Sequence, residues 1–290
     1  MVHARIRLEY RVNLMSEIKV ACRASPLAQA QSQILLSAIE KKGQLVLCDS
    51  RLDLHQDNSI RDLDPSLHSF TKEVDLLVQA GQADLGCHSA KDMGLELANG
   101  LSAYCFVERD IPNDAWVGPS PEDLPPGSVV GTDSPRREHI IKQQYPHLVV
   151  KSIRGNIGTR LRKFQEGQYD ALVLAACGLK RLNVSLNYQL LPLDIFVPAM
   201  NQGIILTTIS DLHVEHDNLR AREHQHTRSS FDIERTIGQA LQLSCNDPIG
   251  IYADTNGFVR LYMGHIKRWY TFDTTSNHSL DNWLEGIKNG

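Results

Sequence analysis

The feature that most constrains this chain is the alternation of short apolar runs with helical patterns, joined by brief connections. In the first half, the run EIKVAC at 17–22 precedes a helical pattern that begins at Pro26, and the run QLVLC at 44–48 follows it. In the second half, SVVG, HLVVKSI and YDALVLAA alternate with helical patterns in the same way. This alternation predicts an α/β fold, with parallel sheets covered by helices on both faces.

The pattern changes after about residue 211. A charged, histidine-containing connector leads into the amphipathic helical pattern SFDIERTIGQALQL, and three strand-like runs follow, GIYADT, FVRLYMGHI and RWYTFDT. A helix followed by consecutive strands no longer fits the alternating scheme. The sequence therefore predicts a small α+β domain at the end of the chain.

The length and the distribution of apolar residues exclude some classes of protein. A chain of 290 residues usually divides into two or three domains. No apolar run approaches the ~18 residues that a membrane span needs, so no membrane association is expected. The basic opening, 1–17, lacks the apolar core of a secretory signal, and Met15 is an alternative start. We expect residues 1–17 to form an N-terminal extension that need not be ordered.

The cysteines indicate a compartment. The chain has six, widely spaced and without a CxxC pair, which is typical of reduced, mostly buried thiols in a cytoplasmic protein. Their spacing, and that of the histidines, does not resemble a metal site, so no metal is expected.

Cations gather at the ends of the predicted strands. The segment 131–181 holds ten Lys or Arg residues against four Asp or Glu, in a chain whose formal net charge is −4. Ligands of open parallel sheets bind outside the carboxyl ends of the strands, and guanidinium groups bind carboxylates through paired hydrogen bonds. The sequence therefore predicts a cleft for a small polyanion, lined by cations that follow these strands: Arg23, Arg136, Arg137, Arg154, Arg160, Lys180 and Arg181.

Two other interpretations of the cations in the segment 131–181 remain open. Lys142, Arg162 and Lys163 fit better as solvated residues on helix faces. Binding to nucleic acid is less favoured, because the basic segment has no aromatic stacking pattern and the whole chain is acidic.

An acidic residue and a thiol are candidates for chemistry. Asp92 ends the run HSAKD, just after a predicted strand; among cations it could stabilise a developing positive charge or pass a proton to a leaving amine. Alternatively, it pairs with Lys91 or caps the next turn. His88 could act as a base, although a structural role is more common at such a position. Cys245 lies in the turn SCNDPIG, where an exposed thiol near a cationic cleft would suit covalent attachment.

Several of these stretches occur together in one known family. CRASPLA, FTKEVDLLVQAGQADLGCHSAKD, GTDSPRR, SIRGNIGTRLRKFQEGQYDALVLAACGLKRL, VPAMNQG and SCNDPIG follow one another in that order. In these motifs the chain resembles the porphobilinogen deaminase (hydroxymethylbilane synthase) family. The resemblance implies two lobes with doubly wound sheets, like those of periplasmic binding proteins, and a small α+β C-terminal domain. The implied domains are 18–110 with 203–222, 111–200, and 223–290.

The resemblance also implies an activity. Members of this family are transferases of heme and porphyrin biosynthesis that deaminate porphobilinogen and join it into the linear tetrapyrrole hydroxymethylbilane. The primer is a dipyrromethane cofactor, here implied on Cys245, and Asp92 corresponds to the catalytic aspartate. The residues implied to bind the substrate and cofactor are Arg23, Ser25, Phe70, Lys91, Thr132, Ser134, Arg136, Arg137, Arg154, Arg160, Arg181 and Gln202. A monomer is expected, because the cleft must open around a lengthening product.

The sequence departs from the family pattern in places. The polar segment 49–69 has no regular period. Its last part and Phe70 form the run DLDPSLHSF, which stands where the family has a lysine-bearing loop of the GGKGLF type, so the lysines of that loop are missing here. Asn201 replaces a glycine before Gln202. We therefore expect reduced catalytic efficiency. The alternative is a two-lobed protein that has kept the anion cleft and lost the chemistry.

Overall fold

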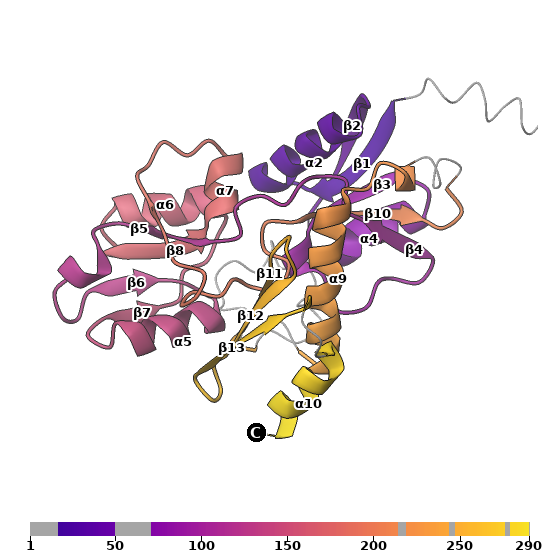
Figure 1. Cartoon of the computed structure of the whole chain (residues 1–290). Helices are drawn as coiled ribbons and strands as arrows, with labels where there is room; N and C mark the ends of the chain where they lie inside the picture. The colour runs from indigo at the N-terminus through magenta and orange to yellow at the C-terminus, as the bar shows by residue number, and fades with distance from the viewer. Residues whose placement is uncertain (1–16, 50–70, 214–218, 244–246, 276–278, 290) are drawn as a thin grey trace, which may run out of the picture.

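The computed structural model describes residues 17–49, 71–213, 219–243, 247–275 and 279–289. Within these ranges it contains two five-stranded sheets, each with its own helices, and one three-stranded sheet (Figure 1). The predicted class, two α/β lobes with a small C-terminal α+β unit, is confirmed. The predicted extension, apart from residue 17, and the polar segment 50–69 lie outside the described residues. None of the helices in the described ranges is long and apolar enough to cross a bilayer.

The first lobe is built on a sheet with the strand order β2-β1-β3-β10-β4. Strand β1 pairs in parallel with β2 and β3, whereas β10 lies antiparallel between β3 and β4. Ser25 caps helix α2 and Pro26 opens it, as the sequence predicts. The elements are β1 (Ile18–Arg23), α2 (Pro26–Ala38), β2 (Gly43–Cys48), α4 (Lys72–Gln79), β3 (Leu85–Ser89), the 3₁₀ turn η4 (Ala90–Asp92), β4 (Leu101–Tyr104) and β10 (Ile205–Ser210).

The second lobe repeats this design with the strand order β7-β6-β8-β5-β9. Strand β6 pairs in parallel with β7 and β8, and β5 runs antiparallel to β8 and β9. Its elements are β5 (Asp114–Val117), η5 (Pro121–Asp123), β6 (Val129–Gly131), α5 (Pro135–Gln144), β7 (Val149–Lys151), α6 (Ile157–Gln165), β8 (Ala171–Ala175), α7 (Ala176–Arg181) and β9 (Gln189–Leu190).

Both large sheets are therefore mixed, where the alternating pattern alone predicts parallel ones. The antiparallel strands β5 and β10 are those that follow the two crossings of the chain between the lobes. Side-chain periodicity identifies a strand but does not record its direction. Strand β10 lies inside the first sheet, and this supports the predicted assignment of 203–222 to the first lobe; the domain boundaries themselves remain predictions.

The C-terminal unit is an antiparallel meander covered by helices. Strands β11 (Ile249–Ala253), β12 (Phe258–Met263) and β13 (Arg268–Asp273) pair in sequence order. Helices α9 (Gln225–Ala240) and α10 (Leu280–Asn289) complete the unit, whose core includes Ile237, Leu261 and Phe272.

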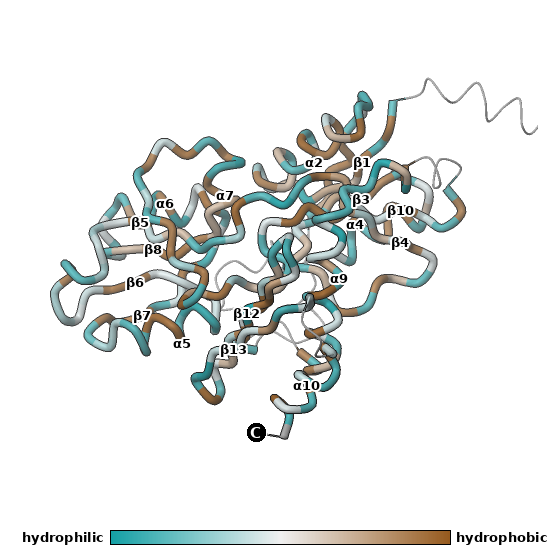
Figure 2. Tube along the Cα trace, viewed as in Figure 1, coloured by the Kyte–Doolittle hydropathy of each residue, from teal (hydrophilic) through white to brown (hydrophobic). Residues whose placement is uncertain are grey.

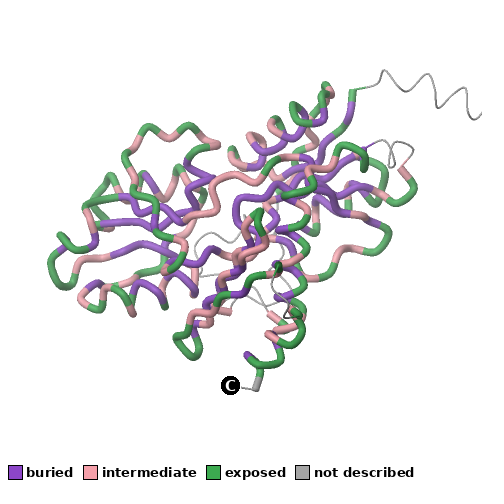
Figure 3. Tube along the Cα trace, in the orientation of Figure 1, coloured by how far each residue is buried: buried purple, intermediate pink, exposed green. Residues whose placement is uncertain are grey.

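Burial follows these layers. Each large sheet has an apolar cluster on both faces, for example around Val20 and Val74 in the first lobe and around Trp116 and Leu172 in the second. Hydrophobic and hydrophilic residues alternate along the covering helices (Figure 2), and buried residues concentrate in the strands of each lobe (Figure 3).

Arg109 joins the lobe crossings to the C-terminal unit. Its Nε donates to the carbonyl oxygen of Gln202 at 2.9 Å, and its Nη1 donates to the buried carboxylate of Glu234 on α9 at 2.5 Å and to the carbonyl oxygen of Ala253 at 3.2 Å. Residues 109 and 202 lie on the two segments by which the chain crosses between the lobes. The contacts of Arg109 therefore join the C-terminal unit to both crossing segments.

Candidate functional site

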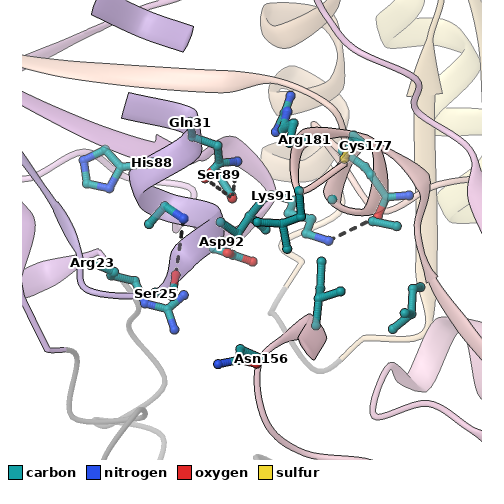
Figure 4. A pocket seen from close by; sticks show the side chains of 18 of the residues that line it. Arg23, Ser25, Gln31, His88, Ser89, Lys91, Asp92, Asn156, Cys177 and Arg181 are labelled. Carbon is teal, nitrogen blue, oxygen red and sulfur yellow. Dashed lines mark hydrogen bonds between the residues drawn. The ribbon is translucent and has the colours of Figure 1, made fainter. Parts of the chain in front are cut away.

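A cavity of about 680 Å³ lies between the two lobes and falls within the size range of small-molecule sites. It is lined by strand ends and helix starts from both lobes. Figure 4 shows Lys91 and Asp92 in the middle of the lining, between Arg23 and Ser25 of the first lobe and Asn156 and Cys177 of the second.

Most of the predicted site residues meet in this cavity. Those that line it are Arg23, Ser25, Lys91, Asp92, Ser134, Arg136, Arg137, Arg154, Arg160, Arg181 and Gln202. The prediction for Lys180 is wrong, because its side chain is exposed outside the cavity and pairs with Asp110 at 2.8 Å. Thr132 is buried beside the cavity without lining it, and its hydroxyl accepts a hydrogen bond from the backbone N–H of Ser134 at 3.3 Å. Phe70 and Cys245 lie outside the described residues. The roles of all of these residues remain predictions.

Local sequence explains why these side chains surround one space. Ser25, Ser134 and Asn156 each cap a helix that starts directly after a strand or loop at the cavity, with side-chain oxygens that accept from the N–H groups of Ala28, Arg137 and Thr159. The carboxyl ends of the strands and the starts of α2, α5 and α6 therefore meet at one edge of each sheet, where anions are favoured.

A buried acid that the sequence reasoning missed holds the paired arginines. Asp114 accepts from Nη1 of Arg136 at 2.8 Å, from Nη2 of Arg137 at 2.7 Å and from Nε2 of Gln202 at 2.8 Å. Its side chain is fully buried. Burial alone would raise the pKa of Asp114, but the two guanidinium groups hold it well below its usual range. The only sequence signal was an Asp at the start of the buried run DAWV.

Several buried guanidinium donors are left over after these contacts. Within the described residues, the Nε–H groups of Arg136, Arg137 and Arg154 are buried and have no hydrogen-bond partner. Buried polar groups are nearly always satisfied. These arginines also line the cavity, and several guanidinium groups around one cavity fit an anionic molecule that bears several carboxylates.

Asp92 stands among these cations. In the described part of the chain the lining contains seven Lys or Arg side chains and the three acids Asp49, Asp92 and Asp133. Burial lowers the pKa of Lys91, although Asp92 opposes this effect, and Nζ of Lys91 donates to Oε1 of Gln202 at 3.4 Å. Burial, helped by Arg137, also lowers the pKa of Arg160 to about 10, with Asp133 and Asp92 acting in the opposite direction.

The contacts of His88 favour the structural interpretation over a role as base. Its Nε2 lies 3.0 Å from Oγ1 of Thr208 and 3.1 Å from Oδ1 of Asp75, and the residue is buried. Thr208 also donates to Asp75 at 3.0 Å. These three residues tie α4 to β3 and β10, directly beneath the turn that carries Asp92.

Two cations interpreted as solvated helix residues are confirmed as such. Lys142 and Arg162 are exposed and pair with Glu138 and Glu166 one helical turn away. Lys163 differs, because its Nζ donates to the carbonyl oxygen of Arg154 and so supports the loop of that arginine.

The fold and the cavity together define a two-lobed α/β protein with a cationic site for a carboxylate-bearing ligand. Residues 18–217 match the family model described as "Porphobilinogen deaminase, dipyromethane cofactor binding domain". The chain is 38% identical over 266 residues to porphobilinogen deaminase of Laribacter hongkongensis, which covers 87% of this chain and 85% of that protein. It is also 38% identical over 252 residues to probable porphobilinogen deaminase of Hyperthermus butylicus, and the aligned region covers 83% of this chain and 83% of that protein.

The chain belongs to the porphobilinogen deaminase family. It is accordingly a transferase of porphyrin biosynthesis that acts on porphobilinogen and uses a dipyrromethane cofactor. Among solved structures it is similar to the VFT2 domain of Bordetella pertussis BvgS, with a TM-score of 0.36 and 16% identity, covering 79% of this chain and 95% of that one. This similarity is too low to add to the assignment.

Proposed function

We propose that the cavity between the lobes is where this chain deaminates porphobilinogen and joins the pyrrole units into hydroxymethylbilane. The observation that carries the proposal is the convergence of cations from both lobes on one cavity that also contains Asp92. Porphobilinogen bears an acetate and a propionate, so every ring added brings two carboxylates into the site.

The arginines of the cavity hold these carboxylates. Arg136 and Arg137 are locked by Asp114 and by the carbonyl oxygens of Val197 and Val173, so each enters the site with one fixed orientation. The guanidinium groups of these two residues and of Arg154 line the cavity and supply donors for the ligand. Preorganised guanidinium groups bind carboxylates well because little side-chain freedom is lost on binding.

Asp92 acts on the substrate through its position beside the reacting carbon. It lies among Lys91 and the arginines, accepts a hydrogen bond from the pyrrole N–H, and stabilises the positive charge that develops as ammonia leaves the aminomethyl carbon. Fixed charge in a cavity shielded from water is worth more than the same charge in solution.

The dipyrromethane cofactor fits the same set of donors. When bound, it supplies the pyrrole carbon to which the first substrate unit is joined. Cys245 is proposed to carry it through a thioether, and the arginines with unpaired Nε–H groups would hold its carboxylates. Cys245 itself lies outside the described residues, so its role rests on the family motif SCNDPIG.

Further properties are proposed on weaker support. The described cysteines are all free, which fits a cytoplasmic protein. A monomer is proposed because the described lining of the cavity comes from both lobes of one chain, and no binding of nucleic acid is proposed because the formal charge is −4. Turnover slower than in relatives with a GGKGLF-type loop is proposed because the lysines of that loop are missing before Phe70.

The alternative of a binder without catalysis is not favoured, since the relatives that match most of the chain are deaminases.

Intact-protein mass spectrometry tests the proposal. After expression, or after reconstitution with porphobilinogen, the chain is expected to carry an excess mass of two linked pyrrole units. This excess is expected to be lost in Cys245→Ser and kept in Cys177→Ser, because Cys177 lines the cavity but is not the predicted attachment site. An unmodified mass together with no consumption of porphobilinogen would contradict the proposal.

A further inference from the structure

The cavity contains a second fixed carboxylate, in addition to Asp92, within the arginine-rich lobe. Asp133 lies in the turn between β6 and α5 and lines the cavity. Its Oδ1 accepts from the hydroxyl of Ser152 at 2.6 Å, and its side chain is only 5% exposed. The hydrogen bond from Ser152 thus helps to hold Asp133 in place at the cavity.

The partner of Asp133 in the cavity is Arg154. The Nη1 of Arg154 lies 3.3 Å from Oδ2 of Asp133, a long contact for a charge-assisted hydrogen bond. The Nε of Arg154 is buried without a partner, and Arg154 is one of the arginines assigned to substrate carboxylates. Asp133 also acts on Arg160, whose pKa it pushes upward against the effect of burial. One resident anion thus faces two of the cations that the substrate needs.

The comparison with Asp114 shows what is special about this contact. Asp114 binds Arg136 and Arg137 at 2.8 and 2.7 Å and does not line the cavity. The negative charge of Asp114 is neutralised by the two guanidinium groups that it binds. Asp133, by contrast, lines the cavity, and its contact with Nη1 of Arg154 is longer, at 3.3 Å, so its charge also acts on whatever binds next to Arg154.

We propose that Asp133 is an affinity-setting residue: a resident counter-anion that weakens the hold of Arg154 on the carboxylates of the substrate and of the growing chain. The inference rests on the proposed function of the cavity. A product that gains two carboxylates with every ring is bound more tightly at each step, and a fixed negative charge beside Arg154 limits this increase. Asp133 acts through Arg154 and does not take part in bond making.

The variant Asp133→Asn separates charge from structure. The amide oxygen can accept from Nη1 of Arg154 while the amide NH2 donates to Oγ of Ser152, so both contacts can be kept while the negative charge is lost. Removing a negative charge next to the arginine that binds a substrate carboxylate is expected to tighten binding about tenfold. Asp133→Glu, which retains the charge, is expected to leave affinity within about threefold of the parent. Asp123→Asn makes the same charge change at an exposed position of the same lobe and serves as the matched control.

Calorimetric titration of porphobilinogen gives the direct test, in an Asp92→Asn background whose turnover is expected to be too slow to consume the substrate during the titration. Asp133→Asn is expected to lower Kd about tenfold relative to this parent, and Asp123→Asn is expected not to change it. In the enzyme with Asp92 intact, the same substitution is expected to lower KM without a rise in kcat. Most of the gain in affinity is expected to persist at 0.5 M salt, because charges as buried as those of Asp133 and Arg154 are screened much less than exposed ones.

The possible outcomes are distinct. An unchanged or weaker affinity in Asp133→Asn overturns the inference about Asp133 and leaves the proposed function standing. If Asp133→Asn does not fold, Asp133→Ser is used, and the same direction of change is expected. No binding of porphobilinogen in the parent, under conditions where the protein is folded, would overturn the proposed function and this inference with it.

Discussion

The two lobes share an architecture and differ in what they place at the carboxyl ends of their strands. The first lobe supplies Asp92 on a turn that follows strand β3. This strand is fixed by the contacts among His88, Thr208 and Asp75. The second lobe supplies most of the arginines, two of which are fixed by the buried carboxylate of Asp114. The comparison teaches that one scaffold can present Asp92 on one lobe and most of the arginines on the other, because a different set of buried contacts supports the strand ends of each lobe.

The largest effect is expected from the acid of the first lobe. Asp92→Asn keeps the shape of the side chain and removes its charge, so turnover of porphobilinogen is expected to fall by about 10² to 10⁴. Steady-state formation of hydroxymethylbilane measures this, with Asp123→Asn as the control for a change of surface charge. Turnover within threefold of the parent would show that the first lobe does not supply the reactive acid.

The buried acid of the second lobe is expected to have the largest effect on stability. Asp114→Ala leaves Arg136 and Arg137 buried without their counter-ion, which is expected to cost about 3–5 kcal/mol in the free energy of unfolding. Urea denaturation measures this loss, and Asp123→Ala is the exposed control. A loss below 1 kcal/mol would mean that the arginines are held by their backbone contacts alone.

The same pair predicts a dependence on pH. Because the pKa of Asp114 is depressed in the folded state, its contribution to stability is full above the ordinary value of ~3.9 and is lost as pH falls from there toward the folded pKa. The free energy of unfolding of the parent should therefore fall more steeply below pH 4 than that of Asp114→Ala. Parallel curves would contradict the assignment.

A smaller effect tests how the strand of Asp92 is supported. A Cβ at Gly86 would lie 2.3 Å from Oγ1 of Thr208 and 3.0 Å from Nε2 of His88, so Gly86→Ala must displace this network at a cost of about 1–3 kcal/mol. Gly94→Ala is the matched control, since its nearest neighbour is 3.8 Å away. Equal stability of the two variants would show that the network tolerates displacement.

The smallest effect concerns the second crossing between the lobes. Asn201 has a φ of 61°, is fully buried, and neither polar atom of its side chain has a partner within the described residues. Asn201→Gly removes the unpaired amide and relieves the backbone, and a gain of about 1 kcal/mol is expected. Asn183→Gly, at an exposed position with a φ of 49°, isolates the backbone contribution. A loss of stability in Asn201→Gly would show that the amide has a partner such as an ordered water.

Sequence reasoning located the lobes and most of the cavity because both depend on local signals. Strand ends, Ser and Pro at helix starts, and arginines after strands can all be found within a few residues of one another. The direction of β5 and β10 could not be predicted, because it depends on where the chain returns between the lobes. Asp114 and Asp133 were missed because their partners, Arg136 and Arg154, are distant along the chain, and only packing brings the charges together.

The central claim is that cations of both lobes bind the carboxylates of porphobilinogen beside Asp92. A crystal structure of the Asp92→Asn variant with porphobilinogen tests it most directly. The account predicts that the two substrate carboxylates contact arginines that line the cavity, with the aminomethyl group next to residue 92. A substrate bound elsewhere, or one whose carboxylates face solvent, would contradict it.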